Sequence, residues 1–124
     1  MQHITLTFAR KFQVMTYRCS HSELLLRSGK TADTPTRVDV LFKDVRALEL
    51  RIYLSELFIE EIDPSQLGPH STKPIEAVEQ GHRAYLIKSG DWSGHIIAGA
   101  VFWHEDDGEF GAPSSFMPEV ALLG

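Results

Sequence analysis

The chain has 124 residues and a formal net charge of −5, from 17 acidic residues against 12 lysines and arginines, and 43% of its residues are hydrophobic. This length and composition predict one soluble globular domain and exclude a chain that is disordered throughout. The single cysteine, Cys19, excludes a disulfide scaffold and a cysteine-rich zinc ribbon.

The first residues, Met1 to Phe8, contain no long apolar segment of the kind that signal peptides carry. The longest apolar run, Ile96–Trp103, is much shorter than the roughly 20 residues needed to cross a bilayer. A lone thiol is typical of a reducing compartment. We therefore expect a cytoplasmic protein with no membrane partner.

Four segments in the first third of the chain alternate apolar and polar residues. Ile4, Leu6 and Phe8, for example, alternate with Thr5 and Thr7. A period of two places the apolar side chains on one face of a strand and the polar ones on the other. The breaks between the segments are short, as antiparallel neighbours allow. The predicted strands are 3–9, 12–19, 22–28 and 36–43.

The stretch 45–62 fits two structures. Leu50, Leu54 and Leu57 fall on one helical face, and the Leu, Glu and Arg content favours a helix. The alternation at both ends of the stretch favours two strands, with a break between them. We predict the two strands as a hairpin, and the helix remains the alternative. The predicted strands are 45–51 and 57–62.

A short helix is expected near 74–80. Thr72 can cap such a helix, Pro74 suits the first turn, and Gly81 supplies the glycine that commonly follows a helix. The residues before it, 64–74, contain three prolines and predict a loop.

Two further strands are predicted at 83–88 and 95–103, separated by the glycine-containing loop Ser89–Gly94. The second strand is apolar enough to be covered on both faces. The globular domain is expected to span 1–111. The remaining segment, 112–124, retains apolar residues and is expected to be a C-terminal tail that is either docked or flexible.

Together these elements predict a mainly β fold, α+β at the margin. The expected architecture is a single antiparallel β-sandwich or partly open barrel of about eight strands with one short helix. The residues expected in the core are Ile4, Leu6, Phe8, Val14, Leu24, Leu26, Val38, Val40, Phe42, Leu48, Leu50, Ile59, Leu86, Ile97 and Val101.

One part of the chain resembles a known group of proteins. The run Tyr17–Ser28, followed by Arg37–Val45, is similar to short bacterial proteins of unknown function. In those proteins a Ser-His-x-x-Leu-Leu-Leu-Arg-Ser strand precedes a Val-Leu-Phe-Lys-x-Val strand. The resemblance covers about 14–62 and departs at Arg51–Leu54, where a small polar turn is expected. It implies a small, mainly β bacterial domain and no activity, cofactor or catalytic residue.

Three histidines are the candidate ligand-binding or metal-binding residues. His21 lies two residues after Cys19, so the pair could act as thiolate and imidazole, or the cysteine is simply buried. His95 and His104 bracket one predicted strand, which places them on opposite faces and roughly 30 Å apart if the strand is straight. His104 could form half a cation site with the acids that follow it, but no metal-ligand spacing accompanies it. No cofactor is expected.

Partner-binding candidates gather in two places. Trp92 lies at a loop tip, where it either contacts a partner or folds back onto the core. Trp103 precedes an acidic run at the end of a strand. The predicted partner-binding residues are Asp91, Trp92, Trp103, Glu105, Asp106 and Asp107.

The sequence contains no hydrolase, phosphate-loop or dinucleotide motif. We expect a non-enzymatic protein-binding module of immunity or accessory type in a bacterium, with a protein partner or a homodimer. A small-molecule or metal-binding β-barrel protein, or a minor enzyme, with a histidine-containing pocket is the alternative. Nucleic-acid binding through Arg10, Lys11, Arg18 and Arg27 is a remote third, because the net charge opposes it.

Overall fold

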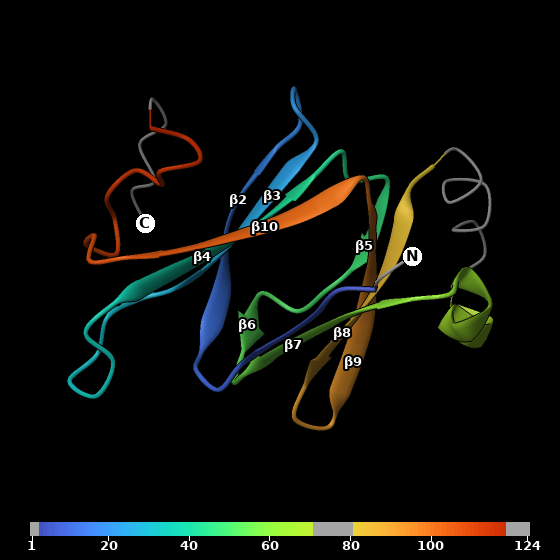
Figure 1. Cartoon of the computed structure of the whole chain (residues 1–124), viewed down its shortest axis with the longest axis horizontal. Helices are drawn as coiled ribbons and strands as arrows, with labels where there is room; N and C mark the ends of the chain where they lie inside the picture. Colours follow the sequence, from blue (N-terminus) through green and yellow to red (C-terminus); the bar gives the residue numbers. More distant parts are fainter. Residues whose placement is uncertain (1–2, 71–80, 119–124) are drawn as a thin grey trace.

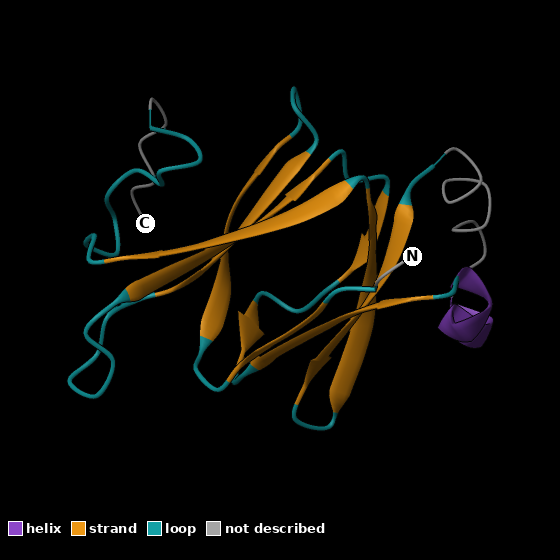
Figure 2. Cartoon of the chain, viewed as in Figure 1, coloured by secondary structure: helices purple, strands orange, loops and turns teal. Residues whose placement is uncertain are grey.

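The structure is a computed structural model that describes residues 3–70 and 81–118. Within these residues, ten strands form two antiparallel sheets of five strands each (Figure 1). The sheets do not close into a barrel, and strands dominate the chain (Figure 2). The predicted mainly β sandwich is therefore confirmed. The helix predicted at 74–80 lies outside the described residues.

The first sheet, called sheet A here, carries a short helical cover on its outer face. This cover is the 3-10 turn η1 (Pro64–His70), in a segment predicted as loop. Leu67 of η1 packs against Ile62, Ala84 and Ile97, which point outward from the sheet. In spatial order, sheet A contains β1 (Thr5–Phe8), β7 (Leu57–Ile62), β8 (Arg83–Ser89), β9 (Trp92–Ala98) and β5 (Ala47–Glu49).

The second sheet, sheet B, is covered on its outer face by residues 107–118, called the C-terminal arm here. Met117 of the arm is fully buried against Leu25 and Leu41. The arm and η1 lie at opposite ends of the molecule (Figure 1). In spatial order, sheet B contains β10 (Ala100–Asp106), β4 (Arg37–Lys43), β3 (Glu23–Ser28), β2 (Phe12–Arg18) and β6 (Tyr53–Leu54).

One paired ladder passes from sheet A into sheet B. β9 and β10 are separated only by Gly99, and the β4–β5 connection lies beside that residue. The amide of Gly99 donates to the carbonyl of Lys43 at 2.9 Å. Asp44 has a φ of 56°, a left-handed conformation that aspartate tolerates. Lys43 pairs with Ala100 in sheet B, and Ala47 pairs with Ile97 in sheet A. Three residues lie between Lys43 and Ala47, but only two lie between Ile97 and Ala100. The extra residue is a β-bulge, which bends the paired strands at the corner between the sheets.

The main core lies between the inner faces of the two sheets and contains most residues predicted for it. Leu48 is an exception, because it lies on edge strand β5 with 43% of its surface exposed. Leu86 and Ile97 pack in the outer cluster under η1 instead. Tyr85 is fully buried, its hydroxyl has no hydrogen-bond partner in the described part of the chain, and burial raises its pKa to about 12.

Two predictions about strand pairing are wrong. Segments 45–51 and 57–62 do not form a hairpin, because β5 pairs with β9, β6 pairs with β2, and β7 pairs with β1 and β8. The helix alternative is also absent, since the described residues 45–62 contain only strands and connections. The single strand predicted at 95–103 is two strands of different sheets, because the chain bends at Gly99.

Candidate functional site

A row of polar side chains crosses the outer face of sheet B. Gln13 is directly opposite Tyr53 on β6 and Arg27 on β3. Arg27 is opposite Asp39, which is opposite His104 on β10. Cross-strand partners point to the same face of a sheet, so these five residues form one transverse line. The arm covers the middle of the line and leaves its two ends exposed.

The middle of the line is an ion pair with no solvent contact. Arg27 and Asp39 are 0% and 1% exposed, and both guanidinium–carboxylate bonds form, at 2.7 and 3.0 Å. The remaining guanidinium nitrogen donates to the carbonyls of Phe110 and Ala112 in the arm. A buried charge needs such complete pairing. The pair therefore holds the arm at a fixed place on the sheet.

A second arginine holds the beginning of the arm. Arg37 makes two bonds of 2.9 Å to the carboxylate of Asp106 and donates to the carbonyls of Glu109, Ala112 and Pro113. The hydrogen bond from Arg37 lowers the pKa of Asp106, although burial opposes it. The same bond raises the pKa of Arg37. Asp106 thus has a structural partner within its own chain.

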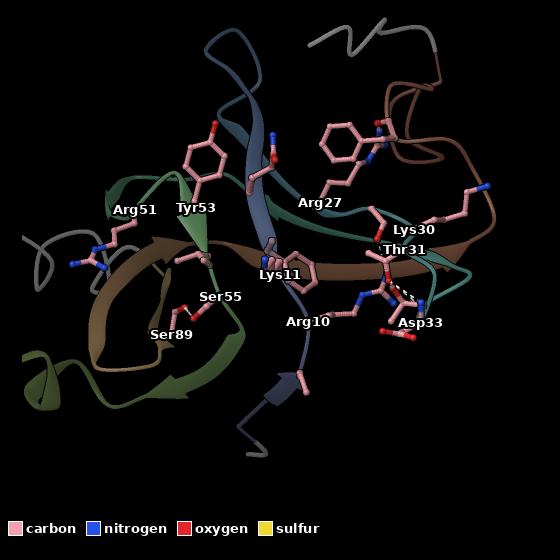
Figure 3. Close-up of a pocket in the computed structure, with 17 residues that line it drawn as sticks. Arg10, Lys11, Arg27, Lys30, Thr31, Asp33, Arg51, Tyr53, Ser55 and Ser89 are labelled. Carbon is pink, nitrogen blue, oxygen red and sulfur yellow. Dashed lines mark hydrogen bonds between the residues drawn. The ribbon is translucent and has the colours of Figure 1, made fainter.

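A cavity of about 880 Å³ opens beside the arm, along β2 and β6 (Figure 3). Gln13 and Arg27 belong to its lining, together with the rings of Tyr53 and Phe110. The ring of Phe110 lies so close to Gly29 that an added Cβ would come within 2.7 Å of it. This volume is within the range of small-molecule sites.

The lining of this cavity is cationic in a chain that is acidic overall. It includes five cationic residues and one acidic residue, Asp33. Figure 3 shows them spread along the cavity rather than gathered at one point. The cationic lining residues are Arg10, Lys11, Arg27, Lys30 and Arg51.

The other exposed feature is the free edge of sheet B. β10 is an edge strand of seven residues, paired only with β4 in the described structure. Phe102 is 44% exposed and Trp103 is 49% exposed, on opposite faces of the strand. Large aromatic side chains with such exposure beside an unpaired strand edge are typical of an interaction surface.

The three predicted histidines lie apart. His21 is in the β2–β3 turn beside Ser20, His95 lies on β9 by a small pocket near Leu67, and His104 packs on Phe116. No cluster of three metal-ligating side chains occurs in 3–70 or 81–118. Cys19 is exposed in its turn, so the alternative of a buried cysteine is wrong.

The predicted partner-binding residues divide into different environments. Trp92 is folded back onto the main core, with its ring across Gly94 and the Arg51 guanidinium over it at 5.6 Å. Asp91 is exposed in the β8–β9 turn. Trp103 and Glu105 are exposed on β10, Asp106 is paired with Arg37, and Asp107 begins the arm.

The sequence reasoning missed the cavity and the arginines that hold the arm. One signal was present. Arg27 directly follows the apolar run Leu24–Leu26, and Asp39 interrupts the apolar run Val38–Phe42. Opposite charges inside two neighbouring apolar strands indicate a buried pair and hence a covering segment.

Comparisons with protein-family models, with curated proteins and with solved structures each find no match. In the described part of the chain, no helix has the length and apolar character to cross a bilayer. Function is therefore inferred from the side chains of this chain alone.

Proposed function

We propose that the protein is a protein-binding module whose partner adds a strand to the free edge of β10. The observation that carries this proposal is the seven-residue unpaired edge of β10 with Phe102 and Trp103 exposed beside it. Main-chain hydrogen bonds to such an edge give affinity, and side-chain contacts on the two faces of the strand give specificity. The partner is another protein or a second copy of this chain.

The other free edges support this proposal less well. β6 has two residues, β5 has three and β1 has four, so each offers a shorter ladder than β10. Glu105, exposed near the end of β10, also favours a partner with a basic side chain at that position.

The test compares two double variants with the same change of charge. Phe102→Lys/Trp103→Lys places lysines beside the β10 edge. Leu48→Lys/Ile52→Lys changes residues of similar or greater exposure on and after β5. Capture from the native lysate and sedimentation velocity measure a partner and self-association, respectively.

We expect the unmodified chain and the Leu48/Ile52 variant to retain the same partner or dimer, and the β10 variant to lose it. Amide hydrogen exchange of β10 should also slow in the complex. A complex that survives both lysines on β10 contradicts the proposal, as does an unmodified chain that stays monomeric and captures nothing.

A further inference from the structure

The cavity beside the arm carries a second inference, independent of the β10 edge. We propose that it is a binding site for a small organic dianion that contains a planar ring. The proposal rests on the balance of charge in the lining, on the absence of carboxylate partners for particular cations, and on two exposed rings.

The charges of two cations in the lining are already balanced. Arg27 pairs with Asp39, and Lys30 pairs with Glu109 at 2.9 Å. In the described part of the chain, the other three, Arg10, Lys11 and Arg51, have no carboxylate partner within ion-pair distance. Set against Asp33, three such cations leave an excess of two positive charges. An excess of this sign attracts a dianion into the cavity.

The three cations differ in how they are held. The Arg10 guanidinium donates only to neutral oxygens, those of Ser28, Gly29 and Thr36, so it is a fixed charge. Lys11 is exposed and makes no hydrogen bond within the described residues. The Arg51 guanidinium lies over the Trp92 ring at 5.6 Å and makes no hydrogen bond or ion pair within those residues. Lys11 and Arg51 are therefore available to contact a ligand directly.

The two rings give the ligand its shape. Tyr53 is 73% exposed and Phe110 is 39% exposed, and both line the cavity. Tyr53 is on β6, whereas the Phe110 carbonyl is held by Arg27 of β3. β2 lies between β6 and β3 in the sheet, so the two rings line the cavity on either side of β2. The flat ring of a ligand can stack on an exposed aromatic side chain of this kind.

Between the two strands the lining offers an uncommitted amide. Gln13 lies in register with both Tyr53 and Arg27, and its side chain has no hydrogen-bond partner among the described residues. It is placed to bond a ligand oxygen while the ring stacks beside it. An aromatic phosphate monoester and an aromatic dicarboxylate share the required chemistry of two negative charges and a ring.

The experiment is calorimetric titration of the full chain at low salt with four probes. Phenyl phosphate and isophthalate are the two ring-bearing dianions. Inorganic phosphate supplies charge without a ring, and benzyl alcohol supplies a ring without charge. We expect both dianions to bind more tightly than either control, with an affinity that falls as salt rises. The tighter of the two identifies phosphate or carboxylate as the preferred anion.

Variants then locate the site. Lys11→Ala and Arg51→Ala should each weaken dianion binding roughly tenfold, the size of one charge-assisted hydrogen bond. Lys88→Ala is the matched control, because Lys88 also lies over a ring, that of Phe58 at 5.7 Å, but outside the cavity lining. Tyr53→Ala should remove the preference for a ring, and Tyr53→Phe should keep it.

Three results overturn the proposal: neither dianion binds the unmodified chain, either control binds as tightly as the dianions, or Lys11→Ala and Lys88→Ala have equal effects. The Phe102→Lys/Trp103→Lys variant should bind the dianions as the unmodified chain does. The proposal for the cavity can therefore fail without affecting the proposal for the β10 edge, and the reverse also holds.

Discussion

The outer faces of the two sheets are both covered, but by contacts of opposite kind. On sheet A, Leu67 inserts among apolar side chains. On sheet B, Arg27 and Arg37 donate to the carbonyls of the arm, with Met117 as the main apolar contact. An apolar contact is stabilising in many orientations, whereas a guanidinium group can donate hydrogen bonds only to oxygens that lie at particular positions around it. Sheet B therefore fixes the path of its cover, and with it the wall of the cavity.

The largest effect should come from breaking the cover of sheet B. Arg27→Ala leaves Asp39 buried without a partner, which typically costs about 3–5 kcal/mol of unfolding free energy. Urea unfolding measures the change. Arg27→Met/Asp39→Leu removes both charges and should recover much of the loss. If Arg27→Ala and this double variant were equally unstable, the buried charge would not be the cause.

A smaller effect should come from breaking the cover of sheet A. Leu67→Ala should lower the unfolding free energy by about 2 kcal/mol, near the low end for buried leucines, because the cluster around it is small. The matched control is Leu48→Ala, at a half-exposed position, with a change below about 0.5 kcal/mol. Thermal and urea unfolding of both variants provide the comparison. Equal losses would mean that η1 contributes little to covering the sheet.

The smallest effect should come from the bond between Asp106 and Arg37 at the beginning of the arm, and it should depend on pH. The pKa of Asp106 is lowered from 3.8 in the folded chain by its bond to Arg37, so the unfolded state binds that proton more tightly. Its contribution is complete above that ordinary value and is lost as pH falls through the lowered pKa. Asp106→Asn should thus lower the melting temperature at neutral pH and progressively less toward acid pH.

Asp91→Asn, in the exposed β8–β9 turn, is the control for this pH series. Its melting curve should follow that of the unmodified chain at every pH. A constant difference between Asp106→Asn and the unmodified chain across the acid range would show that the carboxylate charge does not hold the arm.

Much of the fold could be predicted from period-two alternation. Strands such as 36–43 and 57–62 agree closely with β4 and β7, because one face of each packs in the main core. The pairing of 45–62 could not be predicted, because alternation identifies a strand's faces but not its neighbour. The bend at Gly99 could not be predicted either, because the residues on both sides of Gly99 are apolar and read as one continuous strand.

Less of the candidate site could be predicted. Trp103 stood out as a large residue before an acidic run, and the structure places it on a free edge. Lys11 and Arg51 are 40 positions apart in the sequence and line one cavity only because β6 pairs with β2. The buried pair of Arg27 and Asp39 required knowing that the arm covers them.

The arm also has a consequence for synthesis. Arg27 and the carbonyl that it holds at Phe110 are separated by 83 residues. At roughly 5–20 residues per second, a ribosome takes about 4–17 s to add that much chain. Leu25 and Leu41 are likewise synthesised long before the residue that buries them, Met117. Until the arm is synthesised, the chain exposes these apolar side chains, and exposed apolar surface of this kind promotes aggregation.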